Sequence, residues 1–328
     1  MRHSATAPGH TPQVDKLSRT TPGGHVSANG VGWALASALA FSLSSVVGKD
    51  LLGALGVASL LFWRFSVAAT VLWVALLIWR RRRGPDPFAV PHRHLIGLGV
   101  LLGVVVLLGF EALERLDASV YIVLVYLYPA IVVASSAALG KRTPPSTWVA
   151  LAVITVGVVL TVPEVFTGVG TISTAGVLLA LGQAVAFAGY MMLSSRVVPA
   201  HLDGVVTAAW TNAGVVLFVT PFALVGGLTR PHGSHLLLEV GLFALIPTVA
   251  ALVCFFRASR ALPPAVVAMI MTLEVALAIA WSVIFLGEHL GLIELIGAAA
   301  VTVGVVIAQR TAAAVVEPLE VEPNLLGH

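Results

Sequence analysis

The sequence predicts an all-α, polytopic membrane protein of about ten transmembrane helices, arranged as two inverted five-helix repeats. The first reason is composition, because 58% of the 328 residues are hydrophobic and 10% are charged, with a mean hydropathy of +1.00. Soluble domains are roughly 45–50% apolar and about 25% charged. The second reason is that several charge-free stretches approach the ~20 residues that a helix needs to cross the hydrocarbon core. The third is an internal repeat of the sequence.

Turn residues and charges divide the apolar sequence into about ten spans. These spans lie near 30–48, 56–79, 95–112, 118–139, 146–163, 174–195, 204–228, 236–256, 263–286 and 291–309. The flanking segments 1–29 and 310–328 are too polar to cross a membrane, and we expect both to be loose cytoplasmic tails. Pro129, Pro221 and Pro247 fall within or near span interiors, where the missing N–H predicts kinks or locally opened backbone.

Basic residues predict the orientation of the spans. With the N-terminus in the cytoplasm, fourteen of the 18 lysines and arginines lie in cytoplasmic segments, among them the run Arg80–Arg83. Lys49, Arg115 and Arg230 fall in outside loops, and Arg64 falls within a span. Because short cytoplasmic loops carry the excess of basic residues, we expect an inner (plasma) membrane protein with both termini cytoplasmic. Membrane lipid is therefore an expected partner.

The repeat has an offset of 147 residues. The dipeptide Leu139-Gly140 and the motif TVGVV at 155–159 recur as Leu286-Gly287 and TVGVV at 302–306. Trp63 and Trp210 stand at the same offset. An odd number of spans in each copy forces the two copies to point in opposite directions. Inverted repeats are typical of transporters whose substrate site lies near the midplane and opens to each side in turn.

Motifs in both halves carry a family resemblance. They are FLGEHLGLIELIGAAAVTVGVV at 285–306, ALGKRT at 138–143 leading to VALAVITVGVVL at 149–160, WRF at 63–65, ALERLDAS at 112–119, and Pro129. With these motifs the chain resembles the EamA-like ten-helix branch of the drug/metabolite transporter superfamily over nearly all of 30–309. The resemblance implies repeats at 30–163 and 174–309 and alternating-access transport of metabolites, commonly export of amino acids or related solutes. It also implies a cavity lined by spans 1–4 and 6–9, with spans 5 and 10 peripheral.

One position departs from the family pattern. The family often has Glu-Pro in span 9, whereas Glu274 is followed here by Val275. We therefore expect a weaker kink at this position.

Two ionisable residues at membrane depth are the main candidates for a site. A charge near the bilayer centre costs roughly 2.5–3.5 kcal/mol on insertion scales, so each one needs a reason. Glu274 is interpreted as a substrate-binding or proton-coupling carboxylate, or as a structural acid bonded to a neighbouring helix. Arg64 either binds a substrate carboxylate or phosphate through its planar fork or snorkels to the outer interface.

Polar aromatic residues and amides complete the candidate site. Tyr121 and Tyr128 are seven residues apart, as are Gln183 and Tyr190, so each pair shares one face of a helix. We expect these four to line a pocket or to bond neighbouring helices. Further candidates are Trp63, Trp210, Asn212 and Glu111, whereas Ser42, Ser44 and Ser45 are expected to serve helix packing.

The sequence lacks the motifs of several other functions. No P-loop, HExxH, nucleophile elbow or metal-ligand spacing occurs, and Cys254 is the only cysteine. We therefore expect no enzyme, cofactor, metal or nucleic-acid partner. The predicted function is secondary transport of a small-molecule substrate, driven either by the substrate gradient or by protons through Glu274, by a monomer or homodimer. A multidrug or cation exporter, and a non-transporting receptor or intramembrane enzyme, remain as alternatives.

Overall fold

The computed structural model describes residues 28–82, 84, 86–116, 118–141, 143–161, 173–199, 201–286 and 291–316. Residues 1–27 and 317–328 of the predicted tails 1–29 and 310–328 lie outside this range, whereas residues 28–29 belong to the first helix and residues 310–316 to the last. All regular elements in the described range are helical, with one π-helix, η2. They are α1 (Ala28–Ser42), α2 (Ser44–Leu55), α3 (Val57–Arg81), α4 (His92–Leu113), α5 (Ala118–Val125), α6 (Tyr128–Ala138), α7 (Pro145–Leu160), α8 (Thr174–Val197), α9 (Gly204–Val225), α10 (Ser234–Ala244), η2 (Leu245–Ala250), α11 (Ala251–Ala261), α12 (Pro264–Met271), α13 (Leu273–Leu286) and α14 (Leu292–Val316).

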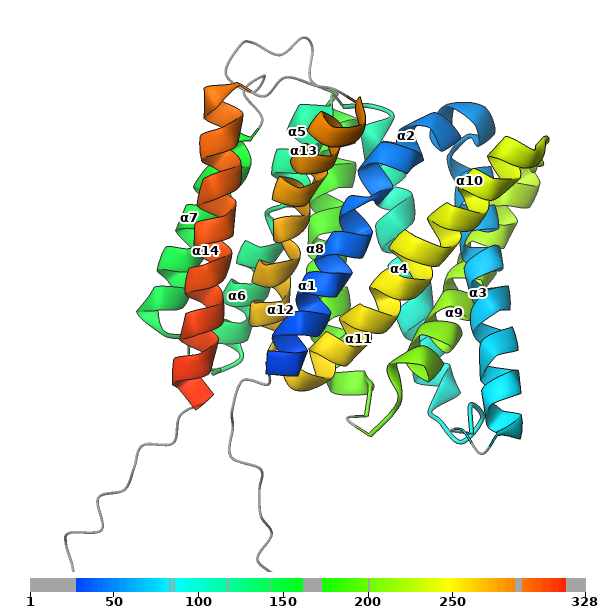
Figure 1. Cartoon of the computed structure of the whole chain (residues 1–328), viewed down its shortest axis with the longest axis horizontal. Coiled ribbons are helices and arrows are strands. Elements are labelled where there is room, and N and C mark those ends of the chain that lie inside the picture. Colours follow the sequence, from blue (N-terminus) through cyan, green and yellow to red (C-terminus); the bar gives the residue numbers. More distant parts are fainter. Residues whose placement is uncertain are drawn as a thin grey trace, which may run out of the picture.

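These helices form the spans of a polytopic membrane protein, as predicted. Six helical stretches in the described range are long and apolar enough to cross a membrane, and shorter apolar helices accompany them. Four predicted spans are built from consecutive pieces: α1 with α2, α5 with α6, α10 with η2 and α11, and α12 with α13. Helix α1 begins and α14 ends at the lower edge of the bundle, which we call the terminal face (Figure 1). The other edge is the opposite face.

The two-fold relationship between the repeats is visible where α7 packs against α14. A Cβ added to Gly157 would lie 2.9 Å from the carbonyl oxygen of Gly297, and one added to Gly304 would lie 3.1 Å from that of Ala150. Gly304 and Gly297 stand 147 residues after Gly157 and Ala150. The same glycine-to-carbonyl contact is therefore made twice, once from α7 to α14 and once from α14 to α7. These helices lie at one end of the bundle (Figure 1).

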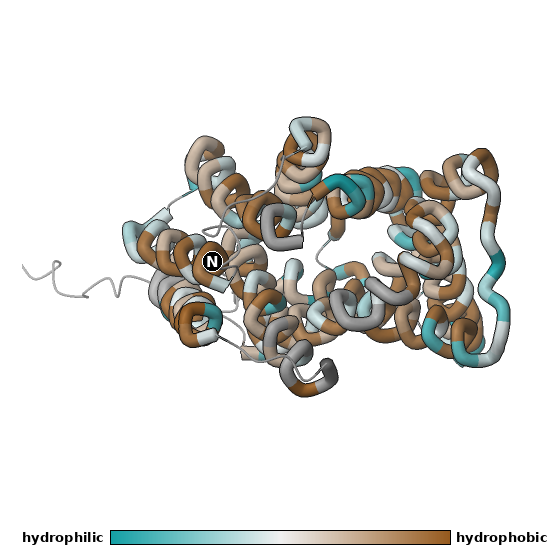
Figure 2. Tube along the Cα trace, turned by 90° about the horizontal axis from the view of Figure 1, so that it is seen from above, coloured by the Kyte–Doolittle hydropathy of each residue, from teal (hydrophilic) through white to brown (hydrophobic). Residues whose placement is uncertain are grey.

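Glycine also allows the two repeats to approach closely at the crossing of α4 and α9. A Cβ on Gly99 would lie 2.8 Å from the Cα of Gly214, which is closer than real Cβ contacts come. Small residues at helix crossings are the usual means of tight packing in membranes. Viewed from above, the bundle is elongated and hydrophobic residues run along most of its helices (Figure 2).

Two helix breaks occupy equivalent places in the repeats. Helix α5 ends at Val125 and α6 begins at Tyr128, while α12 ends at Met271 and α13 begins at Leu273, 146 and 145 residues later. Pro129 explains the first break because it offers no N–H to the preceding turn. Near Glu274, where a weaker kink is expected, span 9 is interrupted at Thr272 without a proline.

Two hydrogen bonds at Thr272, one made by its hydroxyl and one received by its carbonyl, explain the break in span 9. The Thr272 hydroxyl donates to the Ala268 carbonyl at 3.0 Å. The Val275 amide donates to the Thr272 carbonyl at 3.1 Å, three residues back instead of four. A side-chain bond and a tightened turn thus interrupt the regular helical ladder.

Candidate functional site

Arg64 points into the bundle from the first repeat and is held by the second. Its Nε–H donates to the Thr248 hydroxyl at 2.6 Å, and Nη2 donates to the Pro247 carbonyl at 3.0 Å. The guanidinium also lies over the Phe243 ring, 4.3 Å from its centroid. Only 6% of Arg64 is exposed. The snorkelling alternative is therefore wrong for this structure, because strong inward partners hold the charge within the protein.

The partners of Arg64 exist because span 8 is locally opened. Pro247 has no N–H to offer the preceding turn, and the chain widens there into η2. The Thr248 hydroxyl donates to the Phe243 carbonyl at 3.2 Å, so it joins that carbonyl to Arg64. Single-turn π-helical segments often mark functional sites. The expected opening at Pro247 thus supplies the oxygen atoms that bind the guanidinium, whereas α9 continues through Pro221.

Glu274 stands across from Arg64, in the second repeat. It occupies the first turn of α13, where unpaired backbone N–H groups favour a negative charge. Arg64 and Tyr126 are its principal electrostatic neighbours. None of the ion pairs among the described residues joins Arg64 to Glu274, so their charged atoms are more than 4.0 Å apart. Arg64 and Glu274, which come from opposite repeats, are therefore electrostatic neighbours that form no direct ion pair.

A group of polar side chains surrounds Glu274 on the side of the opposite face. Tyr121 lies beside Gln183, and both tyrosines, Tyr121 and Tyr126, are neighbours of Glu274. All four side chains are enclosed by the bundle yet only half-buried. The Gln183 Oε1 is buried with no partner among the described residues. The polar tips of these side chains have the chemistry to bind a solute.

Aromatic rings close the bundle on the other side of this group. Tyr128 packs on Phe187 with ring centroids 4.7 Å apart, Phe187 stacks on Tyr190 at 6.1 Å, and Tyr190 stacks on Phe255 at 5.7 Å. We call these four residues the ring column. Tyr128, Tyr190 and Phe255 are at most 2% exposed. The column joins α6, α8 and α11.

The seven-residue spacing predicts that Tyr121 and Tyr128 share one face of a single helix, whereas the structure places them on two consecutive helices. Tyr121 lies on α5 and Tyr128 on α6, so one continuous helical face does not carry them. Both nevertheless meet α8, Tyr121 at Gln183 and Tyr128 at Phe187. The Tyr128 hydroxyl donates to the Ala268 carbonyl at 3.2 Å. The Tyr190 hydroxyl is buried without a partner among the described residues.

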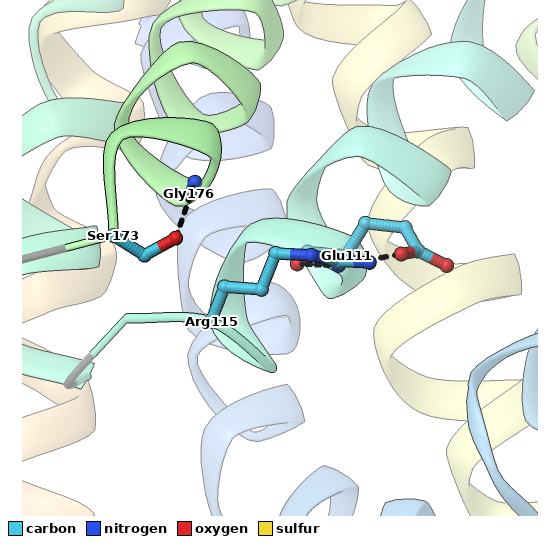
Figure 3. Close-up of polar contacts among 4 residues, drawn as sticks. All are labelled: Glu111, Arg115, Ser173 and Gly176. Carbon is cyan, nitrogen blue, oxygen red and sulfur yellow. Dashed lines mark hydrogen bonds and ion pairs between the residues drawn. The ribbon is translucent and has the colours of Figure 1, made fainter.

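The remaining sequence candidates lie away from Glu274. Glu111 forms a 2.6 Å ion pair with Arg115 at the end of α4, beside the Ser173 cap of α8 (Figure 3). Trp63 donates to the Thr229 carbonyl at 2.9 Å near the opposite face. Trp210 donates to the Pro87 carbonyl at 2.8 Å near the terminal face and packs on Trp73. The polar contacts of these three residues are thus made with groups other than Arg64 and Glu274, although Trp63 packs on the cluster that contains Phe243.

Asn212 lies on α9, near the place where this helix packs against α4 of the first repeat. It is fully buried, and its Nδ2 donates to the Ala208 carbonyl at 2.8 Å within its own helix. Its Oδ1 has no partner among the described residues, as is also true of the Thr211 hydroxyl next to it. These atoms lie near the glycine crossing of α4 and α9, since Gly99 abuts the Thr211 backbone.

Sequence reasoning missed Tyr126, Thr248 and Trp281. Tyr126 is adjacent to the predicted break, and Thr248 follows Pro247, so the proline signals pointed to both regions without naming either residue. Trp281 donates its indole N–H to the Ser42 hydroxyl at 2.8 Å. No pattern in the sequence distinguishes this tryptophan from others in apolar spans. Within the described ranges, no cluster of three or more His, Cys, Asp or Glu residues has the arrangement needed to hold a metal ion.

Comparison with known proteins identifies a family and a matching fold. The model of the EamA-like transporter family matches residues 28–162 and again 174–309. A crystal structure titled only as that of a protein superposes with a TM-score of 0.74 at 21% identity, covering 87% of this chain and 98% of the other. No curated protein matches the sequence. The structural likeness shows a shared fold, and the double family match accounts for both repeats.

Proposed function

Because this chain belongs to the EamA-like transporter family and is a membrane transporter, we propose that it carries a small zwitterionic solute of the amino-acid type by alternating access. The single observation that supports this substrate class is the separation of Arg64 from Glu274. Both are inside the bundle, they attract each other, and yet their charged atoms stand more than 4.0 Å apart. A solute that carries both charges satisfies both residues at once.

In this proposal each residue has a separate role. Span 8 uses two N–H groups of Arg64 and fixes the plane of the guanidinium, and the rest of the fork receives a carboxylate. Glu274 receives the ammonium group, with Tyr126 and Tyr121 beside it. The two charged residues belong to different repeats, so a relative movement of the repeats changes the distance between them. Binding and alternating access are thereby linked.

We further propose export from the cytoplasm across the plasma membrane, coupled to protons. The excess of basic residues in the segments at the terminal face supports a cytoplasmic position for that face. Glu274 supports the coupling, since a carboxylate inside a bundle is costly to keep charged when no solute accompanies it. Proton binding then replaces the ammonium group of the solute after release.

The test is counterflow in proteoliposomes that contain the purified protein and an unlabelled amino-acid mixture. Labelled members of the mixture are expected to accumulate saturably, whereas acids lacking the amino group and amines lacking the carboxylate are expected to compete weakly. Accumulation of no member of the mixture, in vesicles where the protein is folded and oriented, would overturn the zwitterion proposal. Saturable counterflow of any solute excludes the alternative of a receptor or intramembrane enzyme.

A multidrug or cation exporter is the second candidate, because Tyr121 and Tyr126 place aromatic surface beside Glu274. Aromatic faces and a carboxylate together favour organic cations. The two candidates differ in their need for Arg64. A cation exporter retains or gains flux in Arg64→Gln, because a repelling charge is removed, whereas an amino-acid carrier loses it.

A further inference from the structure

Trp281 and Ser42 form a contact between the repeats above the charged pair. The Trp281 indole N–H on α13 donates to the Ser42 hydroxyl on α1 at 2.8 Å. The Ser42 hydroxyl in turn donates to the Leu39 carbonyl at 2.7 Å. Ser42 is fully buried and Trp281 is half-buried. The bond therefore lies within the protein and not at the lipid surface.

The position of Trp281 on α13 places it over Glu274. The two residues are seven apart, which is close to two turns of an α-helix, so their side chains share one face. The rise between them is about 10 Å, which is enough for a small solute. Helix α13 runs from Glu274 toward the opposite face (Figure 1). Trp281 therefore stands between Glu274 and the opposite face along α13.

The partner of Trp281 lies at a break in span 1. Helix α1 ends at Ser42 and α2 begins at Ser44, with Leu43 as the single residue between them. Figure 1 shows α2 leaning away from the line of α1. No proline stands at this break, and Ser44 Oγ is buried without a partner among the described residues. The upper part of span 1 can thus change direction at this point when the bond to Trp281 is lost.

The barrier above Glu274 differs from the barrier below it. On the terminal side the ring column stacks Tyr128, Phe187, Tyr190 and Phe255 in succession. On the opposite side, the packing of α1 against α13 includes the hydrogen bond between the Trp281 indole and the Ser42 hydroxyl. A neutral hydrogen bond contributes less to closure than a set of buried ring contacts, so this bond is the more easily broken of the two features.

We propose that Trp281 and Ser42 are the gate between the Glu274 site and the opposite face, and that the Trp281 ring limits the size of the solute that passes. The gate is closed when Trp281 and Ser42 form their hydrogen bond. It opens when this bond is lost and α2 bends about Leu43. The inference relies on the proposed function for the identity of the site, but the gate itself is tested without any transported solute.

The experiment measures access to a single cysteine placed between the two residues. Ala278 is half-buried and lies on the same face, four residues after Glu274 and three before Trp281. Cys254→Ala removes the only native cysteine, and Ala278→Cys then introduces the reporter. A charged, membrane-impermeant methanethiosulfonate is added to the opposite face of oriented proteoliposomes, and the labelling rate is followed by mass spectrometry.

In this background, Ser42→Ala and Trp281→Phe are each expected to raise the labelling rate by about threefold to tenfold, the effect of losing one neutral hydrogen bond. The double variant is expected to label no faster than the faster single variant, because both changes remove the same bond. Unchanged rates in both single variants would overturn the gate.

Two matched controls separate gating from general loosening. Ser195→Ala removes a serine bond to the Met192 carbonyl within α8, and Trp148→Phe changes an exposed tryptophan on α7. Neither is expected to alter the labelling rate, and a comparable rise in either control would count against the proposal. If labelling responds as expected but amino-acid counterflow is absent, the gate stands and the substrate proposal fails.

Discussion

Arg64 in the first repeat donates its Nε–H to the hydroxyl of Thr248 in the second, over 2.6 Å. This bond crosses the interface between the repeats at the point where span 8 opens into η2. It converts a residue that is costly in a membrane into a fixed, oriented cation. The same interface carries Glu274, so the charged centre exists only when the two halves are assembled.

Replacement of Arg64 tests the oriented cation. Arg64→Lys keeps the charge but loses the planar fork, and we expect flux of a zwitterionic solute to fall at least about tenfold because the carboxylate is no longer bound by two parallel bonds. Arg64→Gln is expected to abolish it. Initial rates in proteoliposomes give the measurement. Arg115→Gln, which breaks the exposed pair with Glu111, serves as the control and is expected to leave flux unchanged.

Replacement of Glu274 tests proton coupling. Glu274→Gln has no proton to exchange, so we expect its residual flux to be independent of pH between about 6 and 8, whereas flux of the unmodified protein varies across that range. An inward proton gradient is expected to accelerate only the unmodified protein. Glu294→Gln changes an exposed acid that caps the Gly291 amide and should behave like the unmodified protein. A pH-independent flux in the unmodified protein would argue against coupling.

The unpartnered hydroxyl of Tyr190 tests whether the ring column changes during transport. Tyr190→Phe removes a buried group that lacks a partner in the described structure, so we expect thermal stability to stay the same or rise. We expect flux to fall severalfold, because the Tyr190 hydroxyl would gain a hydrogen-bond partner in another conformation of the transport cycle. Tyr128→Phe removes a bonded hydroxyl and is expected to lower stability instead. Equal losses of stability in the two variants would contradict this interpretation.

The reciprocal glycine contact of α7 and α14 predicts a matched pair of destabilising changes. A Cβ at Gly157 would approach the Val301 amide to 2.7 Å, and one at Gly304 would approach the Ile154 side chain to 2.6 Å. Gly157→Ala and Gly304→Ala are each expected to lower stability by about 1–3 kcal/mol through overpacking. Gly189→Ala on α8 meets nothing within 4 Å and should be neutral or stabilising. Unfolding in detergent, followed by static light scattering, provides the measurement.

Much of the site region was visible in the sequence, but its connections were not. Pro129 and Pro247 indicated opened backbone, and Glu274 and Arg64 were conspicuous as charges in apolar spans. The break at Thr272 was not predicted, because a threonine hydroxyl bonds to the preceding turn in many unbroken helices. The Trp281–Ser42 contact joins residues 239 positions apart, and no local pattern reports such a pairing.

The amino-acid sequence alone determined the class of fold, the number of spans and the inverted repeat, because hydropathy and an offset of 147 residues are properties of the linear chain. It also identified which charges are exceptional. Only the tertiary structure decided where those charges point, that Arg64 binds span 8 and does not snorkel, and that Glu111, Trp63 and Trp210 have other polar partners. The physical reason is that side-chain direction and partnership depend on how helices from the two repeats pack together, and the sequence of either repeat does not specify that packing by itself.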